Sequence, residues 1–219
     1  MNAPASNLSI VPDEETQRVE LGQRIRWTRN QRGLSMRTLA SAVGVSQSAL
    51  SQIETGRSQP SVQTLYRLVR ELGVSFDELM GLGGGGEADE VCVGGVLGDV
   101  KVDFVPTGSQ KRIDLDTGVT WHRLTSGAVA GANFFRIGHP AGSGSAPAGK
   151  YVSHAGHEFV YVLTGTLRLE VGFDTEHLLH AGDAMNFPAS TPHRASNPGP
   201  DSTEILCSII GGTAATLDK

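Results

Sequence analysis

Only two cysteines, Cys92 and Cys207, occur among the 219 residues. That number is too small for a disulfide framework of the kind that stabilises small secreted domains. Valine flanks Cys92, and leucine and serine flank Cys207, as is typical of buried strand positions. We interpret both cysteines as small core residues. The alternative is a redox sensor, which requires an exposed thiol with a lowered pKa.

Long apolar runs are also missing from the sequence. No stretch of roughly 18 consecutive apolar residues occurs, which argues against a membrane-spanning helix. The first residues, MNAPASNLSIVPDEE, lack the basic and then apolar order of a secretory signal. We therefore expect a soluble, cytoplasmic protein that has no membrane partner.

Positive charge is scarce overall, since the formal net charge is −5, but it is distributed unevenly. Residues 1–72 carry nine basic and six acidic residues, which leaves +3. The remainder carries nine basic and seventeen acidic residues, which leaves −8. A basic segment joined to an acidic one is typical of a nucleic-acid reader joined to a sensor.

Glycine divides the chain into two parts. The run Gly83–Gly86 is too rich in glycine to be helical and has the composition of a flexible linker. The first residues are rich in serine, asparagine, proline and acids and show no periodicity, which predicts disorder. We predict a disordered tail at 1–15, a helical domain at 16–80, a linker at 81–90 and a β-rich domain at 91–213.

Helical periodicity and capping residues mark the predicted helices of the first domain. Serine, a good N-cap residue, precedes four of them, at Ser35, Ser46, Ser61 and Ser75. The first helix, at about 16–32, has side chains that we expect to face a core, namely Val19, Leu21 and Ile25, with Trp27 as a further candidate.

The helix that begins after Ser46 is the candidate reader. Gly44 supplies a tight turn before it, and its apolar residues Ala49, Leu50 and Ile53 share one face. The outward set is then Gln47, Ser48, Ser51 and Gln52. Glutamine pairs bidentately with adenine in the major groove, and hydroxyls bond to several base edges or phosphates. The alternative is a plain helical hairpin with a solvated polar face.

About a quarter of the chain, from Leu21 to Met80, resembles the XRE family, which has the five-helix fold of lambda-type and 434-type repressors. The resemblance implies that Gln47, Ser48 and Gln52 read bases of a double-stranded DNA operator. The residues that carry the likeness are GQRIRWTRNQRGLSMRTLASAVGVSQSALSQIETGRSQPSVQTLYRLVRELGVSFDEL.

Two kinds of arginine are expected in this domain. By the resemblance, Arg29 and Glu54 form a structural ion pair between the first helix and the reading helix, without contacting DNA. Arg37 and Arg57 lie nearest the elements that face the groove, and we predict that they contact phosphate. The alternative for Arg37 and Arg57 is ordinary solvated charge.

The composition of the sequence changes at about residue 91. From there the chain consists of short runs rich in valine, phenylalanine, leucine and threonine, which turn-forming residues separate. Many short strands at regular spacing predict a sandwich or barrel. The predicted strands are KVDFV, KRIDL, VTWHRL, NFFRIG, KYVSH, EFVYVL, TLRLEV, EHLLH, DAMNF, HRAS and TEILCSII.

Two islands in this half, HAGHEFVYVLTG and GDAMNFPASTPHRASN, resemble the motifs of the cupin family. The likeness covers about 101–210 and implies an all-β jelly-roll barrel. The expected fold is therefore multidomain, with an all-α five-helix domain followed by this barrel. The first island fits H-x3-E-x6-G at His154, Glu158 and Gly165. The second fits G-D-x4-P-x4-H-x3-N at Gly182, Asp183, Pro188, His193 and Asn197.

The cupin resemblance makes His154, Glu158 and His193 candidate metal ligands. Two imidazoles and one carboxylate are typical of non-haem Fe(II), and Zn, Mn, Ni or Cu are also compatible with them. Val152 stands where many cupins have a further histidine, which leaves three ligands. We expect His157 to face solvent, because adjacent strand residues point to opposite faces. The alternative is a metal-free polar cluster that hydrogen-bonds an organic ligand.

A pocket for a small-molecule effector is predicted within the β-rich domain. Its identity is open, and arginine and histidine near the mouth hint at an anion. The candidate lining residues are Trp121, Arg123, Phe135, Tyr151 and Tyr161.

The two resemblances together imply a DNA-binding transcriptional regulator without catalytic residues, whose cupin domain binds an effector, a divalent metal ion or both. Small readers commonly act as two-fold dimers, so we expect a homodimer. One alternative is a mononuclear iron oxygenase or epoxidase that retains the helical domain, similar to hydroxypropylphosphonate epoxidase. Another is a metal-storage or isomerase-type cupin, for which the outward Gln47, Ser48 and Gln52 have no purpose.

Overall fold

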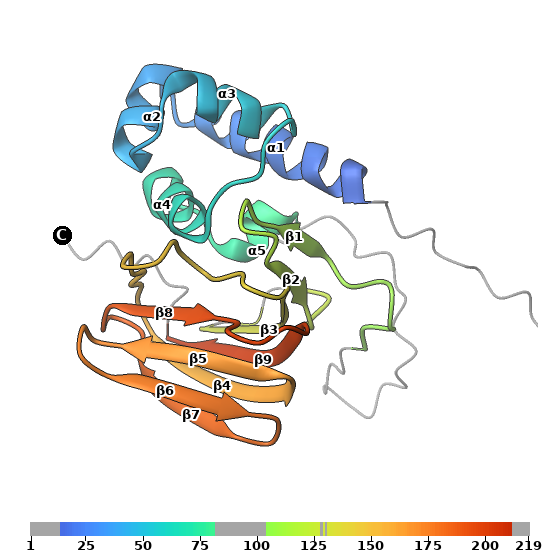
Figure 1. Cartoon of the computed structure of the whole chain (residues 1–219). Coiled ribbons are helices and arrows are strands. Elements are labelled where there is room, and N and C mark those ends of the chain that lie inside the picture. Colours follow the sequence, from blue (N-terminus) through green and yellow to red (C-terminus); the bar gives the residue numbers. More distant parts are fainter. Residues whose placement is uncertain (1–13, 82–103, 128, 130, 212–219) are drawn as a thin grey trace, which may run out of the picture.

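The computed structural model describes residues 14–81, 104–127, 129 and 131–211 (Figure 1). Most of the predicted tail at 1–15, most of the predicted linker at 81–90, and Cys92 lie outside these residues. Within the described part, no helix combines the length and the apolar character that crossing a membrane requires.

Five helices make up the described N-terminal part: α1 (Glu14–Gln31), α2 (Met36–Val43), α3 (Gln47–Glu54), α4 (Val62–Leu72) and α5 (Phe76–Met80). The predicted serine caps are confirmed, because each serine side chain accepts a hydrogen bond from the backbone N–H three residues later. Gly44 ends α2 at a φ of 75°, a left-handed conformation that favours glycine. The glycine therefore makes the turn that presents α3.

The prediction that Trp27 faces the core is wrong, since its side chain is 64% exposed. Leu21 and Ile25 are buried as expected, and Val19 is half-buried. Residues four apart share a helix face, so the buried position that follows Ile25 on α1 belongs to Arg29. Trp27 lies two residues before Arg29 and is turned to solvent.

Nine antiparallel strands form two sheets in the described C-terminal part, which fits a jelly roll. Alternate residues of the long strands are buried, so one face of each packs toward a shared core. The six-stranded sheet has the order β1-β2-β3-β9-β4-β7, and the three-stranded sheet has the order β6-β5-β8. The strands are β1 (Arg112–Asp114), β2 (Thr120–Arg123), β3 (Ala132–His139), β4 (His157–Thr164), β5 (Thr166–Val171), β6 (Glu176–His180), β7 (Ala184–Pro188), β8 (His193–Ser196) and β9 (Thr203–Ile210).

The prediction of a strand at KYVSH (150–154) is wrong. This segment is a loop that makes one isolated bridge, in which Val152 and His193 exchange backbone hydrogen bonds of 2.9 Å. Gly149 and Gly156, with φ of 73° and 104°, turn the chain on either side of it. For KVDFV, residues 101–103 lie outside the described part, and Phe104 belongs to no strand.

Helices α4 and α5 lie between the other three helices and the sheets (Figure 1). Phe76 of α5 packs on the rings of Trp121 and Phe135, with centroids 5.9 and 6.4 Å apart. At the other end of the contact, Gln17 of α1 accepts a 2.8 Å hydrogen bond from the backbone of Arg112. One continuous cluster of buried apolar side chains therefore extends from the helices into the sheets.

A buried ion pair crosses the same boundary. Arg123 of β2 is 0% exposed and Asp77 of α5 is 2% exposed, and their Nη2 and Oδ1 atoms are 2.7 Å apart. The other nitrogens of Arg123 donate to the side chains of Thr125 and Asn133. Burial raises the pKa of Asp77 and lowers that of Arg123, and each partner's charge opposes the shift of the other. The pair therefore fixes α5 on the β domain.

We expect Asp77→Ala to lower the free energy of unfolding by about 3–5 kcal/mol, because it leaves the charge of Arg123 buried without its carboxylate. Urea titration followed by circular dichroism measures the loss. Glu204→Ala is the matched control: Glu204 pairs with Arg136 at the surface, where these side chains are 40% and 35% exposed. Its loss should be about 1 kcal/mol or less. Equal losses in the two variants would contradict the structural role of the buried pair.

Candidate DNA interface and metal centre

The polar side chains predicted to read DNA are exposed on α3. Ala49 is half-buried, and Leu50 and Ile53 are buried, so the opposite face of the helix is the one that packs inward. Arg37 on α2 and Arg57 after α3 are also exposed. The exposed set on α3 is Gln47, Ser48, Ser51 and Gln52.

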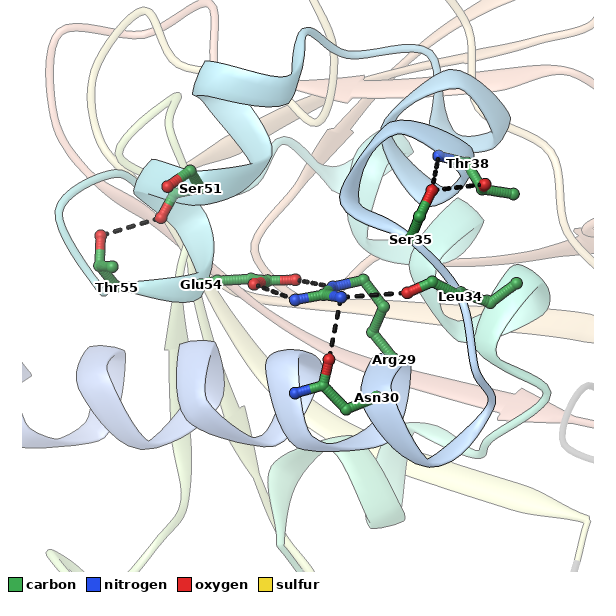
Figure 2. Close-up of polar contacts among 8 residues, drawn as sticks. All are labelled: Arg29, Asn30, Leu34, Ser35, Thr38, Ser51, Glu54 and Thr55. Atoms are coloured by element: carbon green, nitrogen blue, oxygen red, sulfur yellow. Dashed lines mark hydrogen bonds and ion pairs between the residues drawn. The ribbon is translucent and has the colours of Figure 1, made fainter.

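A buried ion pair between α1 and α3 sets the orientation of α3, and Figure 2 shows its two residues facing each other. Nε and Nη2 of Arg29 bond to the two carboxylate oxygens of Glu54 at 2.6 and 3.0 Å. Nη1 of Arg29 donates to the carbonyl of Leu34 at 3.0 Å. The hydrogen bonds that Arg29 donates to Glu54 raise the pKa of Arg29. The expected structural pair is confirmed, and Glu54 is only 3% exposed.

Glycine 22 brings α1 close to the end of α3. A Cβ atom at Gly22 would lie 2.4 Å from the carbonyl oxygen of Ile53, a distance that real side chains do not adopt. Only glycine lets the two helix backbones approach this closely. This packing and the Arg29–Glu54 pair together hold α3 on α1.

The three candidate metal ligands converge although they come from separate segments. His154 lies in the loop before β4, Glu158 on β4 and His193 at the start of β8. One ligand atom from each lies within 4.8 Å of the others. Nε2 of His154 and of His193 are 3.2 and 3.5 Å from Oε2 of Glu158. The side chains of His154, His193 and Glu158 are 8%, 5% and 13% exposed, so the cluster is largely shielded from water.

Both histidine rings are oriented for metal binding by backbone carbonyls. Nδ1 of His154 lies 3.1 Å from the carbonyl oxygen of Ala155, and Nδ1 of His193 lies 2.8 Å from that of Thr191. A carbonyl oxygen only accepts, so each Nδ1 carries the proton. Each Nε2 then presents a lone pair toward the carboxylate of Glu158. This is the tautomer that metal-binding histidines adopt.

The residues present fit a divalent cation. Nε2 of His154 is buried and has no hydrogen-bond partner of suitable geometry in the described part of the chain. Two lone pairs and a carboxylate that face one another repel unless a proton or a cation lies between them. Burial raises the pKa of Glu158, but positive charge on the His154 and His193 rings, together with the Cys207 thiol, lowers it by more, so a proton or a cation between the rings and the carboxylate keeps Glu158 ionised. The carboxylate form needed by a ligand is therefore favoured.

Cysteine 207 supports this cluster as a protonated thiol. Its side chain is 2% exposed, which confirms the prediction of a buried core residue. Sγ donates to Oε1 of Glu158 at 3.5 Å. Burial and the neighbouring carboxylate raise the pKa of the thiol, so the reactive thiolate is disfavoured.

Other residues of the two cupin islands shape the backbone. Gly165 has a φ of 77°, and a Cβ there would lie 2.5 Å from Oγ1 of Thr203. Asp183 accepts from the backbone N–H of His180 at 2.7 Å. Asn197 donates to the carbonyls of His139 and Asp201. His157 is half-buried and lies 3.0 Å from the side chain of Asn186, away from the cluster.

Two cavities adjoin the cluster. An inner cavity of about 30 Å³ is lined by Glu158 and His193, and also by Trp121 and Phe135, two of the predicted pocket residues. A larger cleft of about 470 Å³ lies between α4, α5 and the loop 151–155, and Tyr151 lines it. His154 borders both cavities.

Two predicted pocket residues lie elsewhere. Arg123 lines neither of these cavities, because it is committed to the buried pair with Asp77. Tyr161 is 44% exposed on the outer face of β4, and its prediction is wrong. Its neighbours Val160 and Val162 are buried, so strand alternation turns Tyr161 outward.

Two adjacent residues of α4 reach this region and were not anticipated. The ring of Tyr66 stacks on the ring of His154, with centroids 4.3 Å apart and planes 9° apart. Burial, then Glu158 and Cys207, raise the pKa of the phenol. Arg67 lines the cleft. One feature of the sequence could have indicated this contact. Tyr66 directly follows Leu65 of the apolar stripe of α4, and an aromatic residue beside such a stripe indicates a second buried contact.

We expect His193→Ala to lower bound divalent metal by at least tenfold, because it removes one of the three candidate protein ligands. The full chain is loaded with Fe(II) or Zn(II) and dialysed, and its metal content is measured by mass spectrometry. His157→Ala is the matched control, since His157 is a histidine beside Glu158 that faces away from the cluster. Equal metal content in the two variants would contradict the assignment of the ligands.

Comparisons with known proteins agree with this two-part architecture. The helix-turn-helix family model HTH_3 matches residues 25–79, and the cupin domain model Cupin_2 matches residues 140–209. The HTH-type transcriptional regulator PuuR of Escherichia coli is 27% identical over 197 residues, which cover 89% of this chain and 95% of PuuR.

Two further relatives match to different extents. The uncharacterized HTH-type transcriptional regulator y4dJ of Sinorhizobium fredii is 44% identical over 52 residues, which cover 24% of this chain and 68% of that protein. The crystal structure of an HTH_3 family transcriptional regulator from Vibrio cholerae aligns with a TM-score of 0.61 and 21% identity, over 90% of this chain and 98% of that one. It shares the fold. The chain therefore belongs to the XRE-type family of helix-turn-helix transcriptional regulators and carries a cupin domain after its DNA-binding domain.

Proposed function

We propose that the protein binds a double-stranded operator through α3 and changes its operator affinity when a divalent metal, a small molecule or both occupy the cupin domain. The exposed side chains of α3 suit direct contact with base edges in a major groove. Arg37 and Arg57 flank that helix in sequence and supply positive charge for phosphates. In this proposal the protein is a regulator with no catalytic residues.

The observation that carries the regulatory part is the stack of Tyr66 on His154. Tyr66 belongs to the DNA-binding domain, and His154 belongs to the candidate metal centre, with ring centroids 4.3 Å apart. A ligand alters DNA affinity only if it prefers one arrangement of the reading domain. A cation on Nε2 of His154 would change the charge of the ring on which Tyr66 rests. Occupancy of the cupin site therefore acts directly on α4.

We further propose a homodimer formed through the six-stranded sheet. Four large apolar side chains are exposed on its outer face, at 38%, 42%, 44% and 36% in the order Phe134, Phe159, Tyr161 and Leu163. Phe134 and Phe159 are neighbours across β9, because both pair with Ser208. Contiguous exposed apolar surface of this kind marks protein interfaces. A second copy on this face would hold two readers together, as half-site recognition requires.

A divalent cation at the triad would supply a Lewis-acid centre, and a second candidate function is a mononuclear iron oxygenase or epoxidase. The observation that favours it is the set of His154, Glu158 and His193, which leaves coordination positions open. The inner cavity beside the triad is too small for an organic substrate, so a substrate would have to enter through the larger cleft.

We expect the full chain to bind DNA upstream of its own gene more tightly than unrelated DNA, measured by fluorescence anisotropy across a salt series. Gln52→Ala should reduce that preference by about 5- to 150-fold, because a bidentate base contact contributes roughly 1–3 kcal/mol of discrimination. Arg57→Ala should weaken binding to both DNAs alike and lower the salt slope by about one.

Gln23→Ala is the control for the DNA experiment, because Gln23 is exposed on α1. Equal, weak binding to both DNAs would contradict self-regulation. Failure on neighbouring promoters as well, together with iron-dependent oxygen consumption by the full chain, would favour the enzyme over the regulator.

We expect Tyr161→Arg to convert the dimer to a monomer, because it places a charge in the centre of the apolar face. Light scattering coupled to size-exclusion chromatography measures the mass. Leu178→Arg is the matched control, since Leu178 is 52% exposed on β6 of the other sheet. Dissociation of both variants alike, or a monomeric wild type, would contradict this interface.

A further inference from the structure

We propose that the cleft between the two domains binds a small organic anion and that Arg67 of α4 neutralises its charge. This site deepens the proposed function. Anion binding stands by itself, and only the effect of the anion on DNA affinity rests on the proposed function. The site differs from the metal centre, although His154 borders both. The ligand class is a carboxylate, phosphonate or phosphate monoester with an apolar body.

Size assigns the organic ligand to the cleft. The inner cavity of about 30 Å³ has room for an ion and a water molecule, but not for an organic molecule. The cleft of about 470 Å³ falls within the usual range of small-molecule pockets, roughly 300–1,000 Å³. A metabolite in the cleft would touch His154 and Tyr66 from outside the metal centre.

Charge selects an anion. Arg67 and Arg70 of α4 line the cleft, and none of its described lining residues is an aspartate or a glutamate. Arg70 is already paired, since its Nε and Nη2 lie 3.0 and 2.7 Å from Glu71. Within the described part of the chain, no carboxylate pairs with Arg67, which donates a hydrogen bond to the neutral backbone carbonyl of Val43. An organic cation would find no carboxylate on these walls.

The remaining walls suit the body and the polar groups of such a ligand. Val69, Val74 and Phe76 come from the helical side, and Ile209 comes from the β domain. Tyr151 lines the opposite wall with its ring, while its hydroxyl already donates to Glu170. Apolar surface with a few convergent polar groups is the usual composition of a ligand site.

Arg67 connects the cleft to the reading helix. Its Nη1 donates to the carbonyl of Val43, the last residue of α2, at 3.1 Å. A Cβ on Gly44, in the turn before α3, would lie 2.5 Å from that same nitrogen. An anion that draws the guanidinium into the cleft therefore weakens the hydrogen bond from Arg67 to Val43, which stabilises the turn between α2 and α3. The neutralising residue and the coupling residue are the same.

The test is calorimetric titration of the full chain, without DNA, with matched probes. The anions are hexanoate, 3-phenylpropionate and 2-phenylethylphosphonate. The corresponding amides and amines of the two carboxylates are the neutral and cationic counterparts. We expect at least one anion to bind more tightly than its counterparts. The ranking of phenylpropionate against phenylethylphosphonate distinguishes a carboxylate from a phosphonate or phosphate ligand.

Arg67→Gln should weaken binding of that anion by about tenfold or more, as expected for loss of a charge-assisted hydrogen bond. Ala155→Phe fills the cleft from the β domain without touching the arginine and should also abolish binding. Arg26→Gln, an exposed arginine of α1, should bind as the wild type does. The proposal is overturned if no anion binds better than its amide, or if both cleft variants fold and bind normally.

Operator binding, measured separately by anisotropy with the same anion, distinguishes the two levels of the proposal. Anion binding that leaves operator affinity unchanged would support the site and overturn its coupling to DNA. Specific operator binding without anion binding would overturn the site and leave the regulator intact.

Discussion

The buried contact between Asp77 and Arg123 determines where the DNA-binding domain sits on the cupin domain. Two charges with 2% and 0% exposure are stable only while each has the other, so α5 cannot move away without a large energetic cost. Once α5 is fixed, Phe76 packs on the aromatic residues of the sheet, and α4 is held over the candidate metal centre. The stack on His154, the interdomain cleft and the inner cavity all depend on this placement.

Local sequence patterns predicted the helices well. Serine caps, a glycine turn and helical periodicity are local signals, and they agree with the structure from α2 to α5. Family motifs identified the Arg29–Glu54 pair and the three converging side chains of the candidate metal centre, which lie on separate segments. Helical periodicity did not predict which side chain near the end of α1 is buried, because the polar Arg29 and not the apolar Trp27 occupies that position.

The arrangement of the two domains was not predictable from those patterns. A glycine-rich stretch suggested independent domains, but contacts such as Tyr66 with His154 join residues 88 positions apart, and no local signal records them. The prediction of Tyr161 as a pocket residue failed because the register of β4 was unknown. Likewise, the strand-like composition of 150–154 predicted a strand, although the segment is a loop that Gly149 and Gly156 turn on either side.

The position of His154 on the wall between two cavities has a thermodynamic consequence. A cation on one side of its ring and an organic anion on the other would each alter the free energy of the other's binding, and by linkage the two effects must be equal. If the effects are favourable, each ligand holds the other in place. The promoter would then respond to the two concentrations jointly, as a coincidence detector, and a cell lacking either the metal or the metabolite would leave it in the same state.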